Sequence, residues 1–171
     1  MILSVGDIFP AFEIDVCNSA NELTTEVVEA DGTWKVIYFY PKDFTFICPT
    51  EIAAMDKLTE GFDVRVIGIS GDNEFCKLQW KQSNELIGNI RHSLGADTGL
   101  NLSKQVGAVD QSGSVCIRAT FILDGDNVVK HVSANELDTG RNGDEVLRTL
   151  QALQAGGLTG CQWQPGEDFV G

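Results

Sequence analysis

The sequence predicts an α/β fold in which helices flank a mixed central sheet. Apolar runs typical of buried strands alternate with helical segments along most of the chain. The Asp124-Gly125 pair between two late apolar runs is typical of a hairpin turn. A clear amphipathic helix follows at 142–154. The order strand, helix, strand, helix, hairpin and helix therefore favours a mixed sheet covered on both faces.

Each element has its own signal in the sequence. Five segments have the composition of strands, namely residues 12–17, 34–40, 64–70, 119–123 and 127–132. Four segments are predicted helices, namely residues 50–60, 73–82, 99–106 and 142–154. In the last of these, Asn142 is a favourable N-cap, two acidic residues occupy the first turn, and Gly156-Gly157 ends the helix. A length of 171 residues suits one domain with a substantial core.

Composition excludes several classes of function. The chain has 12 basic and 25 acidic residues, a net charge of −13, which argues against binding to nucleic acid or to an anionic membrane. The N-terminus has no signal-peptide pattern, and no apolar run is long enough to span a membrane. Five widely spaced cysteines without a C-x-x-C pair do not resemble a secreted disulfide framework. We therefore expect a cytoplasmic protein. His92 and His131 have no metal-ligand spacing, so no metal or other cofactor is expected.

The segment Pro41-Lys42-Asp43-Phe44-Thr45-Phe46-Ile47-Cys48 is the most informative part of the chain. It follows the apolar run 34–40, and Pro49 then opens a predicted helix. Cys48 should therefore lie at the start of that helix, where free N–H groups and the helix dipole favour an anion. We expect the thiol to be partly ionised there, and the thiolate is the reactive form.

The spacing of Pro41, Thr45 and Cys48 closely resembles the peroxidatic motif of peroxiredoxins, and the wider string is similar to the typical two-cysteine, alkyl hydroperoxide reductase C branch. The resemblance implies a thioredoxin-like fold with an N-terminal extension, and reduction of hydrogen peroxide and alkyl hydroperoxides through a Cys48 sulfenic acid. Thr45 would bind the peroxide, and Pro41 would shield the thiolate from water. Four further residues match family positions around the thiol: Arg118 as the active-site arginine, Glu51 as the acid that orients it, Arg141 as a second arginine, and Trp80 as a nearby aromatic.

Cys161 lies in a glycine-rich segment after the last predicted helix. By resemblance it is the resolving cysteine, which condenses with Cys48 of a partner subunit. The predicted organisation is a thioredoxin-like domain at 1–155 and a resolving tail at 156–171. The same resemblance implies a homodimer, usually within a ring of dimers, and a separate dithiol reductant, either thioredoxin or a dedicated reductase. In the family's bacterial variant another cysteine stands two residues earlier, where this chain has Thr159.

Two alternatives stay open at this point. The chain could be a one-cysteine peroxidase in which Cys161 takes no part, or a ring-forming holdase chaperone. Several site residues also have plainer interpretations: Thr45 as a loop cap, Trp80 as core filler, and both arginines as surface charges. The remaining cysteines, Cys17, Cys76 and Cys116, are expected to be packing residues.

Overall fold

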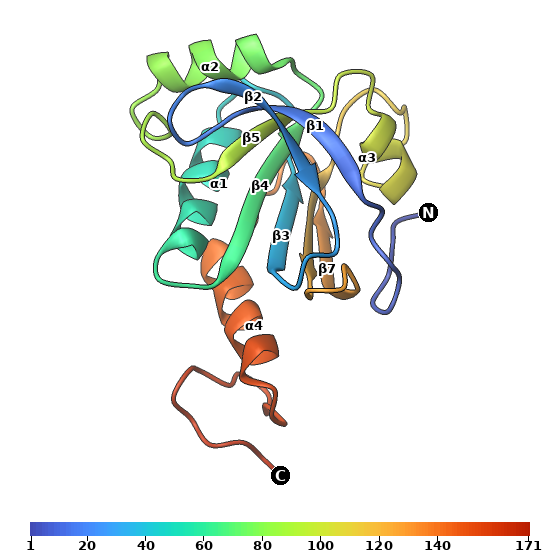
Figure 1. Cartoon of the computed structure of the whole chain (residues 1–171), viewed down its shortest axis with the longest axis vertical. Helices are drawn as coiled ribbons and strands as arrows, with labels where there is room; N and C mark the ends of the chain where they lie inside the picture. Colours follow the sequence, from blue (N-terminus) through green and yellow to red (C-terminus); the bar gives the residue numbers. More distant parts are fainter.

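The computed structural model describes all 171 residues as one seven-stranded sheet with helices on both faces (Figure 1). The strands are β1 (Phe12–Cys17), β2 (Leu23–Val28), β3 (Trp34–Phe39), β4 (Val64–Ser70), β5 (Ser93–Ala96), β6 (Arg118–Leu123) and β7 (Val129–Asn135). The helices are α1 (Cys48–Met55), α2 (Glu74–Ser83), α3 (Asn101–Val106) and α4 (Gly143–Ala155), and a 3-10 turn, η1 (Asp56–Thr59), follows α1. No helix combines the length and the apolar character that a membrane crossing requires.

The sheet has the order β2-β1-β5-β4-β3-β6-β7. The central pairs β3–β4 and β4–β5 are parallel, and all other neighbours are antiparallel. The mixed sheet predicted from the sequence is therefore confirmed. The chain crosses from β3 to β4 through α1, so α1 follows the carboxyl end of a central strand that is buried at every residue after Trp34.

The alternation of side chains on β3 divides the core in two. Val36 and Tyr38 point to the face covered by α1, α2 and α4. Ile37 and Phe39 point to the opposite face, which α3 and the N-terminal segment cover. Tyr38 fits only because its cross-strand partner is Gly68, where an added Cβ would lie 2.4 Å from the tyrosine ring. The first face contains Cys48, so the packing there positions the candidate site.

The structure departs from the sequence prediction at a few elements. β2 and β5 were not predicted: β2 is an edge strand in which only Val28 is buried, and β5 has only four residues, Ser93-Leu94-Gly95-Ala96. The helix expected at 50–60 begins at Cys48 and ends at Met55, where η1 takes over. The strand expected at 127–132 runs instead from Val129 to Asn135, because its last three residues continue the pairing with β6. In the turn between them, Asp124 accepts hydrogen bonds from the N–H groups of Asp126 and Val128.

Candidate active site

Cys48 is the first residue of α1 and is only 1% exposed. The helix has no side-chain N-cap, and Pro49 occupies its second position. The carbonyl of Ile47 accepts from the N–H groups of Thr50 and Glu51, which closes the first turn. The thiol thus lies in the core at the positive end of a helix, an environment that favours an anion.

Arg118, at the start of β6, provides the positive charge beside the thiol. Its Nη1 donates to Cys48 Sγ at 3.4 Å and to Glu51 Oε2 at 2.5 Å, and its Nε donates to the carbonyl of Leu137 at 2.7 Å. Burial alone would lower the pKa of Arg118, but the hydrogen bond to Cys48 and the charge of Glu51 outweigh it and raise that pKa. The guanidinium is therefore a fixed cation in contact with the sulfur.

Glu51 lies one helical turn after Cys48 and is shared by two arginines. Its second carboxylate oxygen accepts from the main-chain N–H and from Nε of Arg141, both at 3.0 Å. Arg141 also donates to the carbonyls of Phe39 and Ala119, and its guanidinium lies 5.0 Å from the centroid of the Tyr38 ring. The buried Arg141 side chain therefore links α1, β3 and β6 through hydrogen bonds. Glu51 in turn binds Arg118, which contacts the thiol.

The loop between β3 and α1 carries the other two residues predicted for the site. Thr45 is half-buried, and its hydroxyl donates to the carbonyl of Lys42 at 2.8 Å, so it caps the loop as the plainer interpretation expects. The lone pairs of the same hydroxyl can still accept a hydrogen bond. Pro41 is half-buried and lines a cavity of about 310 Å³ beside Asp72 and Leu100.

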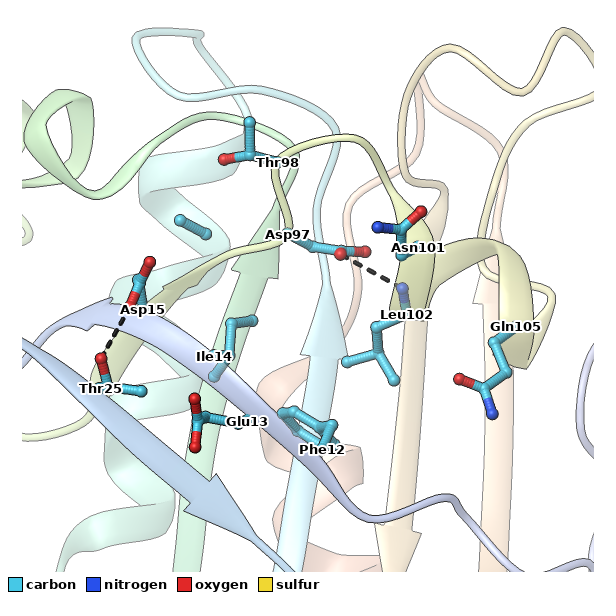
Figure 2. Close-up of a pocket in the computed structure, with 11 residues that line it drawn as sticks. Phe12, Glu13, Ile14, Asp15, Thr25, Asp97, Thr98, Asn101, Leu102 and Gln105 are labelled. Atoms are coloured by element: carbon cyan, nitrogen blue, oxygen red, sulfur yellow. Dashed lines mark hydrogen bonds between the residues drawn. The ribbon is translucent and has the colours of Figure 1, made fainter.

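A surface hollow lies away from Cys48, between β1 and the start of α3 (Figure 2). It has a volume of about 410 Å³. Three of its polar side chains are paired: Asp97 accepts from the N–H groups of Leu102 and Ser103, and Thr25 donates to Asp15. The hollow is lined by no thiol and no cationic side chain, whereas the Cys48 thiol is in contact with the Arg118 guanidinium. That arrangement suits a small electrophile that needs no deep pocket.

Comparison with known proteins gives one consistent family. Residues 5–132 match the AhpC/TSA family model. The chain is 39% identical to alkyl hydroperoxide reductase C of Mycolicibacterium smegmatis over 99% of this chain and 94% of the relative. The chain belongs to this family, the peroxiredoxins. Its membership makes it a thiol-dependent peroxidase, as the sequence predicts.

Solved structures agree with this assignment. The 2-Cys peroxiredoxin of Plasmodium vivax in its reduced form superimposes with a TM-score of 0.88 at 32% identity, over 97% of this chain and 92% of that one. AhpC of Mycobacterium tuberculosis gives a TM-score of 0.86 at 36% identity, over 96% of this chain and all of the other. The thioredoxin-like fold predicted from the sequence is therefore confirmed.

The tail of this peroxiredoxin carries Cys161 in an exposed position after α4. In Figure 1 the tail extends beyond the end of α4 as the lowest part of the molecule. One contact lies within the tail, where the rings of Trp163 and Phe169 stack with centroids 6.3 Å apart. A second contact joins the tail to α4, where Arg148 Nη1 donates to the carbonyl of Trp163 at 3.0 Å. All five cysteines are free in this structure.

Trp80 is buried in the same apolar cluster as Cys48, on the face that α1, α2 and α4 share. Its ring lies 6.1 Å from that of Tyr40 and 5.9 Å from that of Phe44, centroid to centroid. The tryptophan therefore packs in the core beside Cys48 and contacts Phe44 in the loop before the thiol.

Two buried polar groups were missed by reasoning from the sequence. One is the ion pair of Asp43 and Lys77, whose side chains are both fully buried. The signal that could have found it is the spacing of Lys77 and Trp80, three residues apart and so on one helix face. The other is a series of hydrogen bonds centred on His92. Its Nε2 is hydrogen-bonded to the Tyr38 hydroxyl at 2.6 Å, and its Nδ1 is hydrogen-bonded to Asp56 at 2.7 Å.

Proposed function

We propose that this peroxiredoxin reduces hydrogen peroxide and alkyl hydroperoxides with Cys48 as its nucleophile. The observation that carries the proposal is the contact of Arg118 Nη1 with the buried Cys48 sulfur at 3.4 Å. The guanidinium that contacts the sulfur can also bind the peroxide oxygens and stabilise the charge that develops when the O–O bond breaks. The printed name of the Mycolicibacterium smegmatis relative, alkyl hydroperoxide reductase C, supports the organic substrate.

The first step is a two-electron oxidation of sulfur. The Cys48 thiolate attacks the terminal oxygen of the peroxide, and an S–O bond forms as the O–O bond breaks. The leaving oxygen departs as hydroxide or alkoxide and takes up a proton, which gives water or an alcohol, while the sulfur becomes a sulfenic acid. Arg118 stabilises the charge that develops on the leaving oxygen. Thr45 accepts a hydrogen bond from the peroxide, and Pro41 keeps water away from the sulfur.

The second step joins two subunits. The Cys161 thiolate of the partner subunit attacks the sulfenic sulfur, the S–O bond breaks as the disulfide forms, and the hydroxide that leaves takes up a proton from solvent to give water. A dithiol reductant, thioredoxin or a dedicated reductase, then exchanges with that disulfide and restores both thiols. The proposal places the reaction in the cytoplasm, where cellular reductants keep such thiols reduced. The tail at 156–171 acts as the resolving segment of the thioredoxin-like domain at 1–155.

Two surface features support a homodimer within a ring. β7 is an edge strand of the sheet, and Gly6 and Asp7 bond only to the main chain of its first residue, Val129. The open edge beyond Val129 is a template for strand pairing with a second copy. Phe46, in the loop before Cys48, is 97% exposed, and large exposed apolar side chains of this kind mark contact surfaces. We therefore propose pairing of dimers close to the catalytic loop.

Peroxide consumption in the presence of a dithiol tests the proposal directly. Wild-type protein should consume peroxide, and Cys48→Ser should not. Oxidised wild type should run as a covalent dimer on a non-reducing denaturing gel, and Cys161→Ser should remove that dimer. A monomeric oxidised band with full turnover would favour the one-cysteine alternative. Full activity of Cys48→Ser would reject the proposal, whereas holdase activity that survives this substitution would support the chaperone as a second function.

A further inference from the structure

Lys77 is a charged residue of α2 whose side chain is completely buried. Its ammonium group donates to Ser70 Oγ at 2.7 Å, to the Tyr40 hydroxyl at 3.2 Å, and to Asp43 Oδ2 at 3.2 Å. The Tyr40 and Ser70 hydroxyls also donate to the other oxygen of Asp43, at 2.8 and 3.0 Å. Every polar atom of this cluster is therefore paired inside the core.

This ion pair fixes a point in the catalytic loop. Asp43 stands two residues before Thr45 and five before Cys48, while Lys77 belongs to a helix packed under the loop. The main-chain N–H of Asp43 is fixed as well, by Asp72 Oδ2 at 2.7 Å. Because a buried ion pair adds little to stability compared with well-packed apolar residues, its position calls for a role other than stability.

A second contact from the same helix face holds the next residue. Trp80 lies one turn after Lys77, and its ring packs against that of Phe44 with centroids 5.9 Å apart. Phe44 has a φ of 57°, in the left-handed region that non-glycine residues rarely adopt. Such a conformation persists only when its surroundings enforce it. The salt bridge and the aromatic contact together enforce it here.

We propose that Lys77 is a positioning residue for peroxide reduction, which acts through Asp43 to hold the loop over Cys48. We call the ion pair of Lys77 with Asp43 the clamp. While it is intact, Thr45 stays where it can bind the peroxide and Arg118 contacts the sulfur. The clamp also sets the limit of opening: residues after Phe44 are free to leave the site for disulfide formation, and residues up to Phe44 remain attached to α2. This inference rests on the proposed roles of Cys48 and Thr45.

The test compares two buried lysines of one helix. Lys77→Met removes the clamp, and Lys81→Met is the matched control, because Lys81 is 2% exposed but donates to the carbonyl of Asn18, away from the loop. The rate of Cys48 oxidation by hydrogen peroxide is followed by stopped-flow fluorescence in the absence of reductant. Lys77→Met should slow this step at least tenfold and Lys81→Met less than threefold, although both variants should lower the melting temperature.

A second readout separates positioning from stability. Once Cys48 is oxidised, a loosened loop should release it faster, so Lys77→Met should give more disulfide and less sulfinic acid at a given peroxide dose than wild type, measured by mass spectrometry. If Lys77→Met does not fold, Asp43→Asn removes the same charge pair with little change of shape and should give the same pattern. Equal oxidation rates in wild type and the clamp variants would overturn the role of Lys77 alone. Peroxide consumption by Cys48→Ser would instead overturn the proposed function.

Discussion

Arg118→Met tests the proposed site most directly, because it removes the only side chain found to donate to the Cys48 sulfur. Methionine fills similar space without charge, so the core stays filled. Three partners lose a donor: Cys48 Sγ, Glu51 Oε2 and the carbonyl of Leu137. Glu51 keeps two hydrogen bonds from Arg141, so it does not become an isolated buried charge.

The geometry sets the size of the effect. At 3.4 Å, a unit cation and the thiolate attract by about 5 kcal/mol at an effective dielectric of about 20, and by about 1.2 kcal/mol in bulk water. Cys48 and Arg118 are 1% and 5% exposed, so the value for a protein environment is the relevant one. Part of this attraction is already present before the reaction. The rate constant for peroxide should therefore fall about 100- to 1000-fold, as for loss of one stabilising donor in other enzymes.

The assay is single-turnover oxidation of Cys48 by hydrogen peroxide, with Arg141→Met as the control. Arg141 is held in the same network but donates to Glu51 and main-chain carbonyls, with no bond to the sulfur. Both variants break a buried ion pair, at a cost of roughly 3 kcal/mol, or about 6–12 °C in melting temperature. Arg118→Met should nevertheless be the far slower of the two. A rate within threefold of wild type, or equal losses in both variants, would refute the reasoning.

Two other predictions follow from the packing. A disulfide needs Cα atoms within about 7 Å, which a buried Cys48 beneath Arg118 does not permit. Amide hydrogen exchange at residues 45–51 should therefore rise on oxidation, while exchange at Asp43 stays slow. Unchanged protection at 45–51 would contradict this. Burial lowers the pKa of His92 below 6.5 although its hydrogen bond to Asp56 opposes the shift. The unfolded chain therefore binds more protons as the pH falls through about 6.5, so the free energy of unfolding should fall from pH 7 to 5. His92→Gln should weaken that dependence in urea unfolding, and an unchanged slope would show that His92 is not its source.

Much of the architecture could be predicted because local signals agreed with tertiary packing. The helix at 142–154 has a cap, an acidic first turn and a glycine end, and α4 occupies Gly143–Ala155 with Asn142 as its cap. β2 and β5 escaped prediction because an exposed edge strand and a four-residue strand bury too few apolar side chains to create a periodic signal.

The site shows the same division between local and long-range information. The position of Cys48 at the start of a helix followed from the local sequence, and the structure places it there. The ion pair of Lys77 with Asp43 joins residues 34 apart, and the contact of Arg141 with Glu51 joins residues 90 apart. Pairings of this kind depend on how β3, β4 and β6 align in the sheet, and no local pattern encodes that alignment.

Under the proposed mechanism, these two buried pairs would let a thiol be enclosed for one step and released for the next. Asp43 is fixed to α2 on one side of Cys48, and Glu51 is fixed to Arg141 on the other. Only a short segment between them is free to leave, and the four residues after Phe44 span up to about 14 Å when extended. That reach is enough to carry the sulfur out from beneath Arg118 while β3 and the rest of α1 stay folded. Under that mechanism, opening would break one helical turn and leave the core packed, so the site would close again once the disulfide is reduced.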